Sequence, residues 1–354
     1  MKKTKIVISI IIIQLIFVLQ VQSKSNNLKI AFIYVSPVGD AGWTYAHDQG
    51  RKAIEASDLT IEVVESVDEG IQSEPIIEYF AKNHYDIIFA TSYGYMDPVL
   101  KVAKMYPDVI FMHCSGGKQS KNVGTYFGRM YQPRFLTGII AGAMTKSNQI
   151  GFIAAYPISE VIRGINAFAI GVKSINPKAQ VHVVWTKTWF DPKKEKVAAA
   201  TLFDKGVDVI TQHQDSPAAI IAAQKKNVYA IGYNVDMHHF APRFHLASSV
   251  WNWSIIYENT IDQVRQGQWK SQNIWWGIKT GLVDISTISN IVPKSIRQIV
   301  MAKRKELIAG TYSVFKGPIK DQSGKIRIPM NKIASDKQLL DMKWFVEGVQ
   351  GAIE

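Results

Sequence analysis

Short apolar runs alternate with stretches of helical periodicity along most of this chain. Apolar runs of about four to eight residues are typical of buried strands, and apolar positions that recur every three or four residues predict amphipathic helices. The expected strands are 28–35, 61–67, 86–90, 109–113, 124–127, 150–155, 180–185, 207–212, 229–233 and 244–250. The expected helices are 46–56, 72–83, 98–105, 132–145, 161–175, 193–205, 216–226 and 252–265. Parallel strands need crossover helices of this kind, so the order predicts an α/β fold.

Two stretches of the chain begin in the same way. Residues 29–55 and 149–177 each run from an apolar strand through a Pro-containing loop into a helix with Gly or Ala on its packing face. A βα unit that restarts in this way predicts two Rossmann-like lobes with parallel sheets. Because open α/β sheets bind ligands outside the carboxyl ends of their strands, we expect the functional site in the crevice between the lobes.

The segment after residue 233 continues these lobes and does not start a third domain. We expect a signal peptide at 1–23, a first lobe made of 24–145 plus 250–278, and a second lobe made of 146–249 plus 279–354. The chain would then cross between the lobes several times. A hinge of several strands permits closure around a ligand while each lobe keeps its own structure.

The N-terminus predicts export. Lys2, Lys3 and Lys5 precede an apolar run from Ile6 to Leu19, which is shorter than the roughly 20 residues of a spanning helix. Cleavage is expected near Ser23, with an uncleaved anchor as the alternative. No Cys follows the apolar run, so we expect a periplasmic protein that is not a lipoprotein.

Charge and cysteine content narrow the function classes. The net charge of +12 is spread along the chain, whereas a nucleic-acid footprint needs a stripe of basic residues, so nucleic-acid binding is not expected. Cys114 is the only cysteine in the sequence and cannot form an intrachain disulfide. A chain of 354 residues buries enough surface to fold without one, and we expect a monomer.

Motifs of enzymes and metal sites are missing from the sequence. It contains no Gly-x-Gly-x-x-Gly, no Walker Gly-Lys-Ser/Thr and no Cys-x-x-Cys. His238, His239 and His245 lie near Asp236 but lack the i, i+4 spacing of zinc ligands. We therefore expect no cofactor, no metal and no enzymatic activity.

The loops that follow the strands offer candidate ligand residues. Aromatic rings and single carboxylates recur there, and this combination suits a planar polar ligand that is held by stacking and by N–H···O bonds. Each aromatic could equally serve ordinary packing, and Asp40 and Asp215 could cap helices without any ligand. The candidates from these loops are Asp40, Gly42, Trp43, Tyr93, Gly94, Phe127, Trp189, Asp215 and Asp236.

Several motifs resemble one family. GDAGWTYAHDQGRKA, TSYGYMDP, YFGRMYQPRFLTGIIAGAMTK, WTKTWFDPKKE, QHQDSPA and AIGYNVDM are together similar to the basic membrane protein family of ABC-transporter substrate-binding proteins, which includes purine nucleoside receptors. The resemblance covers nearly all of the mature chain and implies a type I periplasmic binding protein fold. It implies that Asp40 and Trp43 clamp a base, and that Asp236 and Lys279, the latter in a later Gly-rich strand, also bind ligand.

The sequence departs from the nucleoside receptors in two places. Gly42-Trp43-Thr44 replaces their Ser-Phe-Asn, and His113-Cys114 stand where an Asp is expected. A lost carboxylate weakens the case for ribose, so we expect a purine base such as adenine, flanked by Trp43 and Trp189 and delivered to an inner-membrane ABC permease. The alternatives are a sugar or furanone receptor of the same fold, or a secreted nucleoside hydrolase.

Overall fold

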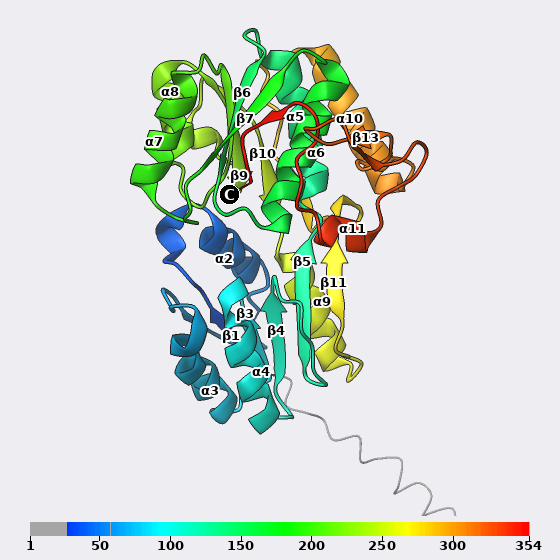
Figure 1. Ribbon diagram of the computed structural model, residues 1–354. Coiled ribbons are helices and arrows are strands. Elements are labelled where there is room, and N and C mark those ends of the chain that lie inside the picture. The colour runs from blue at the N-terminus through cyan, green and yellow to red at the C-terminus, as the bar shows by residue number, and fades with distance from the viewer. Residues whose placement is uncertain (1–26, 57, 354) are drawn as a thin grey trace, which may run out of the picture.

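The computed structural model describes residues 27–56 and 58–353. Two sheets with helices on their faces form two lobes, one above the other in Figure 1. The signal peptide predicted at 1–23 lies outside the described residues. None of the helices in the described ranges is long and apolar enough to cross a membrane.

The first lobe, as far as it is described, is built on a six-stranded parallel sheet. Its strand order is β11-β5-β4-β3-β1-β2. The strands are β1 (Leu28–Ile33), β2 (Leu59–Val64), β3 (Ile87–Ala90), β4 (Ile110–Cys114), β5 (Val123–Gly128) and β11 (Asn273–Trp276). Its helices are α2 (Trp43–Ala53), α3 (Glu74–Lys82), α4 (Met96–Met105) and α9 (Ser254–Arg265), of which α9 packs beside α2.

The second lobe has a seven-stranded sheet in the described part of the chain. Its order is β12-β10-β9-β8-β6-β7-β15, and only the β10–β12 pair is antiparallel there. The strands are β6 (Gln149–Ala154), β7 (Gln180–Trp185), β8 (Val209–His213), β9 (Tyr229–Asn234), β10 (His245–Trp251), β12 (Val283–Ile285) and β15 (Val349–Gln350). Its helices are α6 (Ser159–Ile175), α7 (Pro192–Phe203), α8 (Ala218–Lys226) and α10 (Lys294–Ala309).

Helix α5 (Tyr131–Met144) packs against α6 of the second lobe. Glycines permit the close approach: a Cβ on Gly138 would lie 2.1 Å from the carbonyl oxygen of Phe168, and one on Gly171 would lie 2.1 Å from that of Phe135. The expected lobe boundary at residue 145 falls after this helix, whereas its packing partners belong to the second sheet. The change of lobe therefore comes just after β5.

Three segments of the described chain connect the two sheets: 128–131, 251–254 and 276–283. This arrangement agrees with a hinge of several segments. The expected positions of most strands and helices match the structure to within a few residues, and strand 180–185 coincides with β7. The short strands β11, β12 and β15 are additions that the apolar pattern did not predict.

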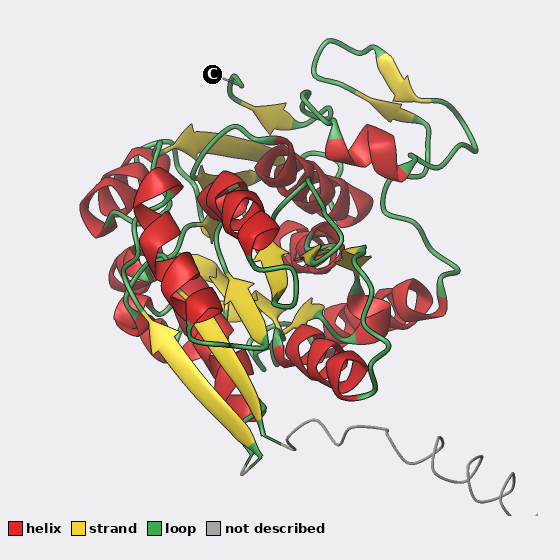
Figure 2. Ribbon diagram, turned by 90° about the horizontal axis from the view of Figure 1, so that it is seen from below, coloured by secondary structure: helices red, strands yellow, loops and turns green. Residues whose placement is uncertain are grey.

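The C-terminal part forms a small appendage beside the second lobe (Figure 2). It contains the hairpin of β13 (Ile319–Lys320) and β14 (Ile326–Ile328), whose turn spans residues 321–325, and helix α11 (Asp336–Leu340). Strand β15 then adds to the edge of the second sheet beside β7. The appendage also reaches the hinge, because Arg129 makes two hydrogen bonds of 2.8 and 2.6 Å to Asp336.

Candidate functional site

The two lobes touch where the loop before α2 meets the loop after β8. A Cβ on Gly42 would lie 2.1 Å from the backbone oxygen of Asp215, so only a glycine fits against that loop. Strands β1 and β8 both end at this junction, as open α/β sheets require of a ligand site. Gly42 and Asp215 were both predicted as ligand residues, and the structure brings them together.

Asp40 fixes the loop of the first lobe. It is buried, and its carboxylate accepts the N–H groups of Gly42 (2.8 Å), Thr44 (2.9 Å) and Tyr45 (3.0 Å) and the hydroxyl of Ser36 (2.8 Å). These bonds satisfy donors at the start of α2 without a ligand, although the N-cap residue of the helix is Gly42 and Asp40 lies two residues before it. Burial raises the pKa of Asp40, and the hydrogen bonds oppose that rise. Its contact with a ligand stays a prediction.

Four aromatic side chains form what we name the hinge aromatic cluster: Trp43, Phe127, Trp251 and Trp253. The Trp43 ring stands edge-on to Trp251 and Trp253, with centroids 5.8 and 5.4 Å away, and Phe127 lies 5.2 Å from Trp251. The Trp43 Nε1 donates to the carbonyl oxygen of Thr91 at 2.9 Å. Because the cluster draws on strands of both sheets, it lines the hinge beside the junction.

A hydrogen-bond chain joins this cluster to the second lobe. The indole Nε1 of Trp251 donates to Asn234 Oδ1 at 3.1 Å, and Asn234 Nδ2 donates to Asp215 Oδ1 at 2.9 Å. Asn234 is the last residue of β9 and has a left-handed backbone with φ of 69°. Asparagine tolerates that conformation better than most residues. Its side-chain amide therefore sits between the indole of Trp251 and the carboxyl group of Asp215.

The carboxyl group of Asp215 lacks a cationic partner among the described residues. Burial raises the pKa of Asp215 well above its usual range, and the negative charges of Asp40 and Glu195 raise it further, against the hydrogen bond from Asn234. Such a group gains from a neighbour that offers an N–H, and it can also keep its own proton and donate it. Of the carboxylates predicted for the site, Asp215 best suits direct contact with a ligand.

Trp189 lies in the neighbouring loop of the second lobe. Its ring stands edge-on to Tyr156 with centroids 5.1 Å apart and lies 6.1 Å from the ring of His213. The carbonyl oxygen of Trp189 accepts the backbone N–H of Asp215 at 3.0 Å, so the two loops are joined directly. His213 is buried, and its Nε2 lies 3.3 Å from Glu160 Oε2. The Trp189 ring and the Glu160 carboxyl group thus both lie beside His213 on the second lobe.

The other predicted ligand residues have their contacts elsewhere. The Tyr93 side chain is 68% exposed, and the Gly94 N–H donates to Glu69 at 2.7 Å. Asp236 is exposed and accepts the N–H of His238 at 2.9 Å. Lys279 was expected in a Gly-rich strand, which is wrong, because it lies exposed in the 3₁₀ turn η5 (Ile278–Thr280). The structure does not bring these four residues to the hinge aromatic cluster, and their contact with a ligand stays a prediction.

Sequence reasoning missed four residues of the site, one of which is Trp253, two residues after the end of β10. Trp251 ends β10 and Asn234 ends β9, so the rule that singled out strand-end residues could have found both. Glu195 lies inside α7 without any recognisable motif, and only the structure places it under the two ligand loops. No group of three or more His, Cys, Asp or Glu side chains that could hold a metal occurs within the described ranges.

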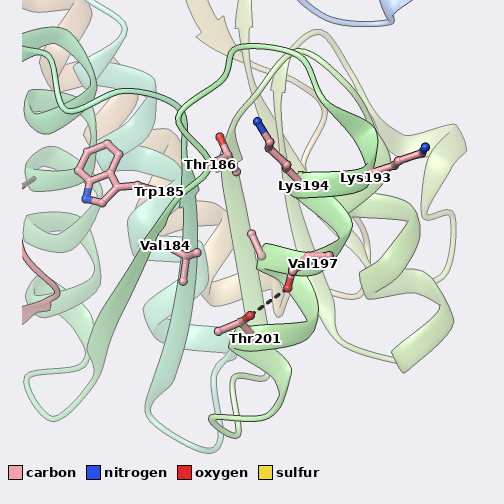
Figure 3. A pocket seen from close by; sticks show the side chains of 8 residues that line it. Val184, Trp185, Thr186, Lys193, Lys194, Val197 and Thr201 are labelled. Atoms are coloured by element: carbon pink, nitrogen blue, oxygen red, sulfur yellow. Dashed lines mark hydrogen bonds between the residues drawn. The ribbon is translucent and has the colours of Figure 1, made fainter.

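A separate surface hollow of about 310 Å³ lies between β7 and α7 (Figure 3). It is lined by Val184, Trp185, Thr186, Lys193, Lys194, Val197, Ala198 and Thr201. Figure 3 shows the Trp185 ring turned away from the other side chains, and its Nε1 donates to the carbonyl oxygen of Ala352 at 2.8 Å. The lining of this hollow contains no carboxylate, unlike the junction.

Comparison with known proteins identifies the family. The family model Bmp, described as "ABC transporter substrate-binding protein PnrA-like", matches residues 27–316. The chain belongs to the Bmp family. Family membership confirms the predicted resemblance and makes this chain a substrate-binding component of the ABC transporter class, which works with a small-molecule ligand and a permease.

Relatives of the Bmp chain differ in the ligands for which they are named. A purine-binding protein of Brucella abortus is 43% identical over 327 residues, 92% of this chain and 93% of its own. A Haloferax volcanii protein assigned as an ABC transporter glucose-binding protein is 37% identical over 334 residues, 94% of this chain and 82% of its own.

Solved structures confirm the fold. An ABC transporter solute-binding protein from Conexibacter woesei superposes with a TM-score of 0.69 at 21% identity, over 81% of this chain and 98% of that one. Another from Aeropyrum pernix gives 0.70 at 17% identity, over 83% and 93%. The two lobes are thus those of a type I solute-binding protein.

Proposed function

We propose that this protein is the periplasmic receptor of an ABC importer and that it binds a purine base, adenine in the first place, at the junction of its lobes. The observation that carries the proposal is the half-buried carboxyl group of Asp215, whose pKa the charge of Asp40 helps to raise and which a hydrogen-bond chain through Asn234 joins to the hinge aromatic cluster. The similarity to the Brucella purine-binding protein supports the same ligand class.

The chemistry of a purine matches these groups. Its flat ring gains affinity by stacking on indole and phenyl faces such as those of Trp43, Phe127 and Trp189. Its edge presents a ring nitrogen acceptor next to an N–H or amino donor. A carboxyl group that keeps its proton offers a donor and an acceptor side by side, so Asp215 can form both bonds with one edge of the base.

Binding at this position also explains how the ligand would close the receptor. Only a ligand that contacts both lobes in the closed form shifts the equilibrium towards it. Trp43 belongs to the first lobe and Asp215 to the second, and Gly42 lets the two loops meet. We propose that the closed form is a monomer that docks on its permease, binds no nucleic acid and catalyses no reaction.

A sugar is the second candidate ligand, because a relative of 37% identity is assigned to glucose. Tryptophan faces also stack on sugar rings, and the half-buried carboxyl group of Glu160, beside the buried His213, could receive a hydroxyl group. A sugar offers no planar edge for Asp215, which is why we place it second.

The test is a binding titration of the protein without its signal segment against adenine, guanosine and glucose, after denaturation and refolding to remove copurified ligand. We expect micromolar binding of adenine, and we expect Asp215→Ala, which removes both the donor and the acceptor, to weaken it at least tenfold. Asp204→Ala, a change of an exposed carboxylate at the end of α7, serves as the control. Tight binding of glucose with none of adenine would refute the proposal.

A further inference from the structure

One buried carboxyl group lies beneath both ligand loops of the second lobe. Glu195 in the first turn of α7 has no exposed surface. Its Oε1 accepts the backbone N–H of Asp191 at 3.1 Å, and its Oε2 accepts a short hydrogen bond from the hydroxyl of Ser216. Asp191 ends the loop that carries Trp189, and Ser216 directly follows Asp215, so one side chain contacts both loops.

We propose that Glu195 is a positioning residue for the ligand site, which ties the Trp189 loop to the Asp215 loop so that ring and carboxyl group face the ligand together. This inference rests on the proposed function. Glu195 touches neither Trp189 nor the carboxyl group of Asp215 through a hydrogen bond of its own. It acts through Asp191 and Ser216.

The neighbouring contacts fit this role. The two loops are also joined directly by the bond from the Asp215 N–H to the Trp189 carbonyl oxygen, 3.0 Å long. Asp191 caps α7 by accepting the N–H groups of Lys193 and Lys194, both at 3.0 Å. Ser216 in turn accepts the N–H of Ala218 at 3.2 Å.

Burial raises the pKa of Glu195 to about 7, so near neutral pH this side chain carries its charge only part of the time. A neutral carboxyl group can keep both contacts, because its O–H can donate to Ser216. Glutamine has the same shape and can also make both bonds, with Oε1 accepting from Asp191 and Nε2 donating to Ser216. The conservative variant Glu195→Gln should therefore preserve the arrangement that Glu195→Ala removes.

Amide hydrogen exchange of the ligand-free protein tests the positioning itself. The amide of Asp215 does not contact Glu195, so its protection reports on the link between the loops. We expect Glu195→Ala to lower that protection at least tenfold, and Glu195→Gln to leave it within threefold of the parent. Lys196→Ala, an exposed change in the same helical turn, is the matched control. The amide of Ala199 inside α7 reports whether the helix itself has opened.

Should α7 open in Glu195→Ala, Ser216→Ala decides the question. It removes the contact of Glu195 with the Asp215 loop and the hydrogen bond from Ala218, but leaves the contact of Glu195 with Asp191 in place. We then expect the Asp215 amide to lose protection while the Asp191 amide keeps it. Unchanged protection of Asp215 in Glu195→Ala with intact α7, or in Ser216→Ala, would overturn the inference.

Binding of adenine tests the consequence for the ligand. We expect Glu195→Ala to weaken binding at least tenfold and Glu195→Gln to stay within threefold. Because Glu195 acts through the Asp215 loop, Glu195→Ala should weaken an Asp215→Ala protein by no more than about threefold. If the two losses multiply independently, Glu195 has a general structural role and the inference is overturned. Adenine binding that is unchanged in Asp215→Ala would refute the proposed function, while the exchange result would still stand by itself.

Discussion

Replacement of Gly42 by alanine should prevent the lobes from meeting. The added Cβ would lie 2.1 Å from the backbone oxygen of Asp215, and carbon–oxygen contacts below 3.0 Å essentially never occur. The added Cβ is bonded directly to the backbone, and the oxygen that it meets is a backbone atom of Asp215, so no change of side-chain rotamer relieves the clash. The loops must separate by roughly 0.9 Å or more, as the difference between these two distances shows.

This separation sets the size of the expected effect. A hydrogen bond from one lobe to a ligand held by the other would stretch from about 2.9 Å to nearly 4 Å, where it no longer counts as one. A donor or acceptor that loses its partner inside a closed site costs about 1–3 kcal/mol. At about 1.4 kcal/mol for each factor of ten, adenine should bind roughly five- to hundredfold more weakly.

Isothermal titration calorimetry of Gly42→Ala measures this loss, and thermal unfolding shows whether the lobes remain folded. Gly39→Ala is the control in the same loop, because a Cβ on Gly39 would have no atom within 4 Å. We expect Gly39→Ala to bind adenine within twofold of the parent. Equal affinities of Gly42→Ala and the parent would show that the ligand does not need the junction seen here, and would refute the reasoning.

Three further predictions follow from the same contacts. Trp43→Ala should weaken adenine binding at least tenfold while unfolding stays cooperative; an unchanged calorimetric titration would contradict its role. Burial raises the pKa of Glu195 from 4.5 to about 7, so the folded protein holds the Glu195 proton more tightly than the unfolded chain does. The stability that this proton contributes is therefore complete below pH 4.5 and is lost as the pH rises through 7. Urea unfolding at pH 5 and pH 8 should therefore show the parent losing on the order of 3 kcal/mol relative to Glu195→Gln, and parallel pH profiles would speak against it. Asp336→Asn breaks the paired hydrogen bonds from Arg129 at the hinge and should lower the free energy of unfolding by about 1 kcal/mol. The control is Asp341→Asn, which breaks the exposed ion pair with Lys337 and should change the free energy of unfolding by less than about 0.5 kcal/mol.

Long buried strands and amphipathic helices were predictable because their periodicity is local. The strand at 180–185 and the helix at 132–145 correspond to β7 and α5. Strand β11 was not predictable, because its four residues pair with β5 only after the chain has crossed the hinge twice. The assignment of α5 to the second lobe was not predictable either, because it depends on the packing of its Gly-containing face against α6, and local periodicity does not show which helices pack together.

The candidate site shows the same division. The loops after the strands were identified from apolar runs followed by Gly, Asp and aromatic residues, and this sufficed to select Gly42, Trp43, Trp189 and Asp215. It did not suffice to separate them from Tyr93, which has the same kind of position and is 68% exposed. Exposure depends on which loop faces the other lobe, and that is not encoded in local spacing.

The amino-acid sequence by itself determined the α/β class, the duplication into two lobes, the family and the set of loops that could bind a ligand, because each of these depends on periodicity and short motifs. Only the tertiary structure decided what each carboxylate does. Asp40 and Asp215 stand in similar loops, yet Asp40 is surrounded by backbone N–H donors, whereas Asp215 accepts one amide and faces other acidic groups. The environment of a charge is set by residues distant in sequence, and only folding brings those residues together.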